Sequence, residues 1–451
     1  MEKKHTNASV FELDGIPKFS QALPLALQHV VAMIVGCVTP AIIVSGAAGI
    51  SGADRVILIQ ASLVFSALAT FLQLFPIGPR NKLHLGAGLP VILGVSFAYV
   101  PSMQAIAEGY GIGTILGAQI VGGVVAILVG LTIRKIRKFF PPLIAGTVVF
   151  TIGLSLYPTA INYMAGGTGS ADYGSWQNWA IALFTLAVVS FLNHFTTGFL
   201  KLASILVGMA AGYVVAFFCG MVDFSSIGEA GLIQLPQLFH FPLHFEISSC
   251  VAIGLLFAIN SVQAIGDFSA TTSGGLNREP KTDELQGAIL GYGISNIIGA
   301  CFGCLPTATY SQNVGIVSTT KVVNRCTLGL AALIILIAGL LPKFSALLTT
   351  IPYCVLGGAT VSVFASIAMT GIKLVMTEEM NYRNTSIVGL AAALGMGVSQ
   401  ASASLALFPD WVTTIFGKSP VVIATLVAIF LNVTLPHEKD RMPKPEPNDI
   451  Y

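Results

Sequence analysis

The chain alternates long apolar runs with short polar breaks over almost its whole length. A run of roughly 20 apolar residues is long enough to cross the hydrocarbon core of a bilayer as a helix. Two segments, 87–102 and 303–318, are shorter and rich in Gly, Pro and small polar residues, and we count them as half-spans. With them, the pattern predicts an all-α polytopic membrane protein of fourteen segments. The full-length spans are predicted at 22–48, 55–75, 111–133, 142–158, 178–198, 201–220, 247–266, 285–302, 323–342, 350–372, 384–403 and 419–436.

The two short segments resemble each other. Both open with Leu-Pro, at Pro90 and Pro306, which are 216 residues apart, and a polar residue lies six positions after each proline. The runs 141–146 and 352–357 repeat a Pro-to-Gly spacing at about the same separation. This indicates two copies of seven segments, and because seven is odd, the second copy must be inverted. Interrupted segments at matching positions of inverted halves point to a transporter's binding site, so segments three and ten are predicted to meet there.

Composition and charge support this topology. Hydrophobic residues make up 54% of the chain and charged residues 9%, against about 25% charged in soluble domains. With the N-terminus in the cytoplasm, 19 of the 22 Lys and Arg residues fall in cytoplasmic loops, and Arg55, Lys343 and Lys418 do not. An excess of Lys and Arg on the cytoplasmic side is usual for membrane proteins. We expect a multi-pass protein of the plasma membrane with both termini in the cytoplasm. In a bacterium, this membrane is the inner membrane.

The net charge and the cysteine spacing argue against nucleic acid, metals and redox cofactors as partners. A net charge of +2 gives no case for nucleic acid. Cys301 and Cys304 form a C-x-x-C pair without a second pair or a flanking His, so we expect no metal and no redox cofactor. No pair of nucleophile and base lies within the spans, so we expect no catalytic residues and no enzyme activity.

Few polar side chains lie within the spans, and three of them share one face of the eighth segment. Asn260, Gln263 and Asp267 follow each other at spacings of three and four residues. A carboxylate at Asp267 must pair, hydrogen-bond or titrate, which links it to proton movement; the alternative is an aspartate held by backbone amides at a helix end. His29, in the first span, is either a functional group or a satisfied structural one.

Two side-chain amides suggest a ligand. Gln312, in the second short segment, and Gln263 each offer a donor beside an acceptor, which matches the lactam edge of an oxopurine or a pyrimidine. Together they can bind two edges of one ring, with the aromatic ring of Phe97 stacked on its face. A channel would show a more continuous polar lining, and an anion transporter of similar architecture would favour a basic residue or bare helix N-termini.

Three motifs resemble those of the nucleobase/ascorbate transporter family. The run 312–321, Gln-Asn-Val-Gly-Ile-Val-Ser-Thr-Thr-Lys, is similar to the family signature Gln-Asn-x-Gly-x-x-x-x-Thr followed by a basic residue. The stretch 263–267, Gln-Ala-Ile-Gly-Asp, resembles the Glu-x-x-Gly-Asp motif, and Gln28-His29 resembles the first-helix Gln/Thr-His pair. The resemblance covers roughly residues 10–436.

The resemblance implies a function and a site. It implies a homodimeric secondary transporter that imports a purine base, xanthine or urate, by proton symport and an elevator-type movement of a core domain against a gate domain. Asn313 would support the pocket, and Asp267 and His29 would tune it. The substrate contacts would be Gln263, Gln312, Ser311 and the backbone of Ser96 and Phe97.

The same resemblance implies a division of the chain, in which the core and gate domains are each built from two separate stretches. The core domain would comprise segments one to four (21–138) and segments eight to eleven (247–342). The gate domain would comprise segments five to seven (139–222) and segments twelve to fourteen (343–436). An extracytoplasmic loop (223–246) and two cytoplasmic tails (1–20 and 437–451) would complete the chain.

Three departures from the family pattern affect these expectations. Gln263 stands where most members carry a proton-linked Glu, and Tyr292 stands where xanthine-type members often carry another acid. The alternative function is therefore a guanine, hypoxanthine or other nucleobase permease with altered or lost cation coupling. Ser96 stands where xanthine permeases tend to carry Asn, and its smaller side chain would leave room for the C8 oxygen of urate.

Overall fold

The computed structural model describes residues 9–79, 84–132, 141–224, 227–228, 231–409, 412–417 and 419–436. The predictions for Arg80, Lys82, the basic run 134–138, the first eight residues of the N-terminal tail and the tail 437–451 lie outside these residues.

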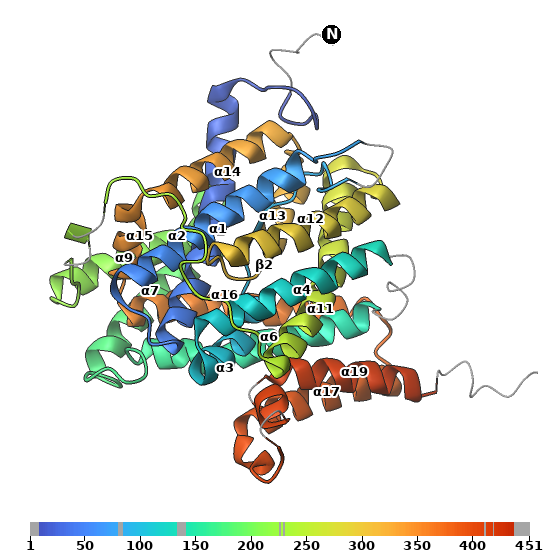
Figure 1. Ribbon diagram of the computed structural model, residues 1–451. Coiled ribbons are helices and arrows are strands. Elements are labelled where there is room, and N and C mark those ends of the chain that lie inside the picture. The colour runs from blue at the N-terminus through green and yellow to red at the C-terminus, as the bar shows by residue number, and fades with distance from the viewer. Residues whose placement is uncertain are drawn as a thin grey trace, which may run out of the picture.

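Helices dominate the described residues, and two three-residue strands accompany them (Figure 1). In chain order the main elements are α1 (Phe19–Ala47), α2 (Gly52–Leu74), β1 (Leu93–Val95), the 3₁₀ turn η1 (Phe97–Tyr99), α3 (Val100–Tyr110), α4 (Ile112–Leu131), α6 (Pro142–Met164), α7 (Trp176–Phe195), α8 (Gly198–Leu202), α9 (Ser204–Phe218), α11 (Ile247–Leu276), α12 (Thr282–Cys301), β2 (Thr307–Thr309), α13 (Ser311–Thr320), α14 (Arg325–Leu340), α15 (Pro342–Thr349), α16 (Tyr353–Val375), α17 (Tyr382–Gln400), η3 (Ser402–Leu405), η4 (Thr413–Gly417) and α19 (Pro420–Thr434).

A helix overlaps each predicted full-length span, with different ends at some of them. The helix predicted to stop at residue 266 continues as α11 to Leu276, where Asn277 adopts a left-handed conformation with φ 52°. The span predicted at 201–220 is divided between α8 and α9. By length and hydropathy, seven described helices can cross a membrane, and an eighth does so if α14 and α15, bent by 81°, count as one span.

The two Leu-Pro segments meet, but as strands followed by helices. Strands β1 and β2 pair antiparallel, with Leu93 opposite Thr309 and Val95 opposite Thr307. The all-helical expectation is therefore corrected at this point. The paired strands provide hydrogen-bond partners for each other's backbone N–H and C=O groups. Non-helical backbone inside a membrane protein requires such partners.

Close side-chain contacts secure this pair of strands. The hydroxyl of Tyr310 donates to Val95 O at 2.6 Å, and the backbone N of Tyr310 donates to Ile92 O at 3.0 Å. Gly94 lies under the Tyr310 ring, where an added Cβ would come within 2.7 Å of a ring carbon. A glycine is therefore needed at this position for the two segments to approach each other.

The helices pack as two groups. In the first group, α1, α2, α4, α11, α12 and α14 contact mainly one another, and α3 packs against α1 and α4. In the second group, α6, α7, α9, α16, α17 and α19 do the same, and α17 and α19 lie side by side at one edge of the molecule (Figure 1).

Helices α6 and α16 are antiparallel and in very close contact. An added Cβ on Gly153 would lie 2.4 Å from Ala368 N, near the middle of both helices. One on Gly357, near the start of α16, would lie 2.3 Å from the backbone N of Met164, the last residue of α6. Small residues allow helices this near approach in membrane proteins.

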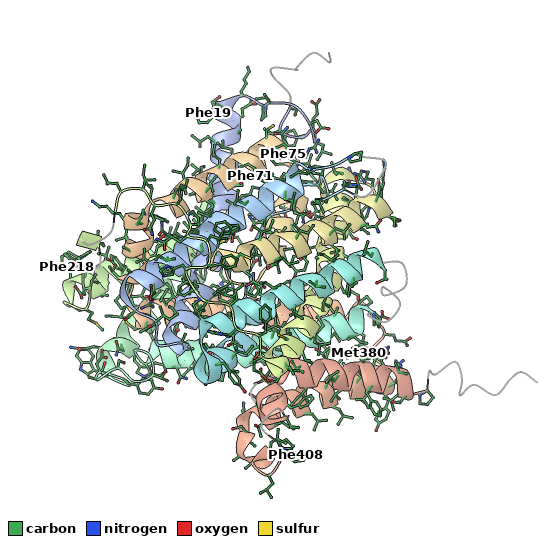
Figure 2. The ribbon with its side chains drawn as sticks, in the orientation of Figure 1. Phe19, Phe71, Phe75, Phe218, Met380 and Phe408 are labelled. Carbon is green, nitrogen blue, oxygen red and sulfur yellow. The ribbon has the colours of Figure 1, made fainter. Side chains whose placement is uncertain are left out.

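The outer surface of the bundle is apolar. Phe19, Phe218 and Phe408 are 65%, 81% and 54% exposed, and Figure 2 shows them at the periphery of the molecule. Other large apolar side chains on the described helices are exposed as well, among them Phe191 of α7 and Phe430 of α19, as expected for helices that face lipid.

Candidate functional site

A cavity of about 270 Å³ lies between the two helix groups, beside the paired strands. One wall comes from α11, β2, α13 and the turn after β1, and the opposite wall from α6 and α16. It is lined by Ser96, Phe97, Ala98, Val149, Ile152, Gln263, Thr309, Tyr310, Ser311, Gln312, Ser366, Ile367 and Thr370.

Two glutamine amides face this cavity from different helices. Gln263 lies on α11, and Gln312 is the second residue of α13. Within the described part of the chain, no hydrogen bond engages either side-chain amide, and both are accessible from the cavity. Each amide therefore keeps a donor and an acceptor available to a ligand.

The start of α11 is well fixed by its cap. The carboxylate of Glu246 accepts hydrogen bonds from Ser248 N at 2.9 Å and Ser249 N at 2.6 Å. Burial raises the pKa of Glu246, but these hydrogen bonds and the one from Ser248 Oγ outweigh it and lower the pKa to about 2. The negative charge also suits the positive end of the helix dipole, so the helix that carries Gln263 begins at a defined residue.

The turn after β1 forms the floor of the cavity. Ser96 N donates to Pro306 O at 3.0 Å, and Ser96 Oγ accepts from Ala98 N at 3.2 Å. The Phe97 ring packs edge-on against Phe364 of α16, with centroids 5.2 Å apart. Phe97 therefore contacts the opposite helix group as well as the cavity.

Asp267 lies behind the cavity wall, one turn after Gln263. Its side chain is buried, and both carboxylate oxygens accept hydrogen bonds, from Thr309 Oγ1 at 2.5 Å and from Ser311 Oγ at 2.8 Å. In the described residues no Lys or Arg pairs with it. Asp267 thus links α11 to the strand and to the helix that together form the second Leu-Pro segment.

His29 and Asn313 are bonded to each other and lie outside the cavity lining. Asn313 Nδ2 lies 3.1 Å from His29 Nδ1 and donates to His29 O at 3.2 Å, and both residues are 1% exposed. This pair ties α1 to α13. Tyr292 is also buried, and its hydroxyl is hydrogen-bonded to that of Tyr99.

The structure brings together most of the residues that the sequence singled out. Ser96, Phe97, Gln263, Ser311 and Gln312 line one cavity, while Asn313, Asp267 and His29 lie in the surrounding layer.

The sequence did not predict the cavity wall that the second helix group contributes. Val149 and Ile152 of α6 and Ser366, Ile367 and Thr370 of α16 carry no motif and follow no unusual spacing. Only the pairing of α6 with α16 places them opposite the glutamines. Thr309 and Tyr310 belong to the second Leu-Pro segment, so the repeated spacing of the two segments could have indicated them.

The chemistry of the cavity is that of neutral hydrogen-bonding groups. Amides and hydroxyls line the side of α11 and α13, and aliphatic side chains together with two hydroxyls line the side of α6 and α16, which suits a flat heterocycle with donors and acceptors on its edges. Among the described residues, no group of three or more His, Cys, Asp or Glu side chains has the arrangement needed to hold a metal ion.

In sequence, the chain is similar to a family of permeases and to individual purine permeases. The family model Xan_ur_permease, described as a permease family, matches residues 20–404. The uric acid permease PucK of Bacillus subtilis is 35% identical over 91% of this chain and 95% of its own length. The xanthine permease of Bacillus subtilis is 33% identical over 92% of this chain and 94% of its own length.

Among solved structures, the transmembrane domain of the cyanobacterial bicarbonate transporter BicA has the same fold. It superposes with a TM-score of 0.58 over 92% of this chain and 98% of that domain, at 15% sequence identity. The likeness concerns the fold alone.

Proposed function

Because the chain belongs to the nucleobase/ascorbate transporter family, we propose that it imports a purine nucleobase, xanthine or urate, across the plasma membrane. The observation that carries this proposal is the pair of unengaged amides, Gln263 and Gln312, on two elements of one cavity. Once a base covers them, hydrogen-bonding amides of this kind reject analogues that lack the matching groups, which suits a carrier selective for particular bases.

The proposed architecture is fourteen segments in two inverted copies of seven. Two pairs of segments that are seven apart in this count support it, since β1 pairs antiparallel with β2 and α6 runs antiparallel to α16. The first helix group corresponds to the proposed core domain and the second to the proposed gate domain, with the cavity between them. Sliding of one group along the other is the proposed elevator movement, within a homodimer whose termini are cytoplasmic.

The proposed coupling ion is a proton, carried through Asp267. In this chain Gln263 and Tyr292 are not acidic, so Asp267 is the ionisable group nearest to the cavity lining on α11. The alternative proposal is a guanine, hypoxanthine or other nucleobase permease whose cation coupling is altered or lost. Ser96 in the cavity lining favours urate within the first proposal, because a small side chain leaves space beside the ring.

Uptake of radiolabelled xanthine into proteoliposomes tests the function. We expect uptake that unlabelled urate, hypoxanthine or guanine inhibits and that uracil and ascorbate do not, and a larger accumulation with an imposed inward proton gradient. Gln312→Ala is expected to reduce uptake, with Gln21→Ala at the exposed start of α1 as the matched control.

Each outcome of this assay has a distinct meaning. Uptake that does not respond to the proton gradient would favour the alternative without coupling. Inhibition of uptake by uracil as strong as by oxopurines would contradict the proposed substrate class, and so would the absence of uptake by folded protein.

A further inference from the structure

We propose that Asp267, while it holds no coupling proton, is an anion at the N-terminus of α13 and restricts the cavity to the uncharged form of its purine ligand. The proposal deepens the function proposed above and rests on it. It concerns which protonation state of the base is bound, and therefore which bases are accepted at a given pH.

The N-terminus of α13 would by itself attract a negative charge. This helix begins at Ser311, and Ser311 and Gln312 both line the cavity. The first N–H groups of a helix and its dipole together favour an anion at this end. A purine anion in the cavity would therefore be stabilised if nothing else compensated the helix.

Asp267 already supplies this compensation. Its two oxygens accept from Ser311 Oγ, on the first residue of α13, and from Thr309 Oγ1, on the strand that leads into it. Two hydroxyl donors, one on each oxygen, are the pattern expected for an ionised carboxylate. The side chain is 8% exposed, so water screens its charge poorly, and the charge acts on a ligand in the adjacent cavity.

Among the residues that the structure describes, no positive group beside the cavity offsets this carboxylate. The cavity lining contains no Lys, Arg or His, and Tyr310, its one titratable side chain, donates its hydroxyl to Val95 O. On α1, His29 is engaged with Asn313. On α13, Lys321 lies at the far end of the helix and donates to Gly274 O. An anionic ligand would therefore lie next to a like charge in a poorly screened site.

Gln263 removes the usual means of accepting an anion in this position. A protonated carboxylic acid can give its proton to an anionic base, whereas an amide side chain has no proton that it can transfer at ordinary pH. The two glutamines instead offer a donor and an acceptor each, which match the neutral lactam form. Hypoxanthine stays neutral to a higher pH than xanthine, which loses a proton near neutral pH. Urate is largely a monoanion at neutral pH, so only its small neutral fraction would bind.

Equilibrium binding of radiolabelled hypoxanthine and xanthine to the purified protein, from mildly acidic to alkaline pH, tests the inference. Above the pKa of xanthine, we expect its affinity to fall by about tenfold per pH unit, because only the neutral fraction is competent to bind. Hypoxanthine affinity should stay constant up to the pH at which hypoxanthine itself begins to lose a proton. It is the internal control, because a titrating group of the protein would change both affinities together.

A substitution then assigns the effect to Asp267. In Asp267→Asn, we expect the affinity for urate relative to hypoxanthine to rise by about tenfold or more, since a like charge at this distance is worth more than one pKa unit. Asp54→Asn, at an exposed position in the first turn of α2, is the matched control and should leave the ratio unchanged.

The possible failures are distinguishable. Absence of binding by every purine would contradict the proposed function itself. Purine binding with equal affinity for neutral and anionic xanthine would overturn only the charge selectivity. If Asp267→Asn does not fold, the pH series on the unsubstituted protein still decides. If the substitution folds and leaves the ratio unchanged, Asp267 is not the origin of the selectivity.

Discussion

At the scale of single residues, the site combines neutral groups that face the cavity with one acid held behind its wall. Gln263 and Asp267 lie one turn apart on α11, yet only the amide lines the cavity, and the carboxylate is engaged by Thr309 and Ser311. The position of an acid along this helix therefore decides whether it can exchange a proton with the ligand. This makes Gln263 the residue at which coupling is most directly tested.

Gln263→Glu is expected to strengthen the proton dependence of uptake. A carboxyl group that faces this cavity without a basic partner favours its protonated form more than an exposed one does, so it can bind a proton together with the ligand. We expect xanthine accumulation in proteoliposomes to increase with an inward proton gradient by a larger factor than in the unsubstituted protein. Gln21→Glu, at an exposed position on α1, is the control. Unchanged pH dependence and unchanged accumulation in Gln263→Glu would contradict this role.

At the scale of elements, polar side-chain contacts join the two helix groups outside the cavity. Ser102 Oγ lies 2.6 Å from Ser419 Oγ, Thr159 donates to Gln104, and Arg55 donates to the hydroxyl of Tyr353. Tyr353 starts α16, whereas Ser366 and Thr370 of the same helix line the cavity, roughly 20 Å further along at 1.5 Å per residue. These contacts must break if the groups slide past each other.

The pair Ser102→Cys and Ser419→Cys, in a background without native cysteines, tests this expectation. The short distance between the two hydroxyls allows a disulfide to form with little backbone movement. We expect oxidation to stop purine uptake and a reducing agent to restore it, because the disulfide joins α3 to the start of α19. Each single substitution should be insensitive to oxidation. Full uptake by quantitatively cross-linked protein would show that this contact does not move during transport.

Among the elements that form the site, some could be predicted from the sequence and others could not. The matched Leu-Pro segments were predicted to meet because their spacing repeats, and they do so at β1 and β2. Their strand conformation was not predicted, because it arises from pairing between residues far apart in the chain. The wall from α6 and α16 was not predicted either, since Val149 and Ser366 resemble many other residues of apolar helices.

At the scale of the whole molecule, the proposed architecture relates the two halves of the chain by inverted repetition. If α6 and α16 occupy matching positions in two copies, their antiparallel packing means that the copies have opposite directions in the membrane. In the proposed topology, 19 of 22 basic residues fall on one side of the membrane, and the usual excess of Lys and Arg on the cytoplasmic side then predicts which side is which. Among the described residues, this pattern includes Lys281 before α12 and Lys373 at the end of α16.

This orientation predicts which loops an impermeant reagent reaches in intact cells. Gly169→Cys, between α6 and α7, should be labelled by a membrane-impermeant maleimide, whereas Glu378→Cys, between α16 and α17, should be labelled only after permeabilisation. A background without native cysteines is needed, because Cys219 is exposed. Both positions lie next to proposed gate helices, so one segment more or fewer between them would place them on the same side. Labelling of both from outside would therefore contradict the fourteen-segment count, and the reverse pattern would contradict cytoplasmic termini while leaving the inverted repeat intact.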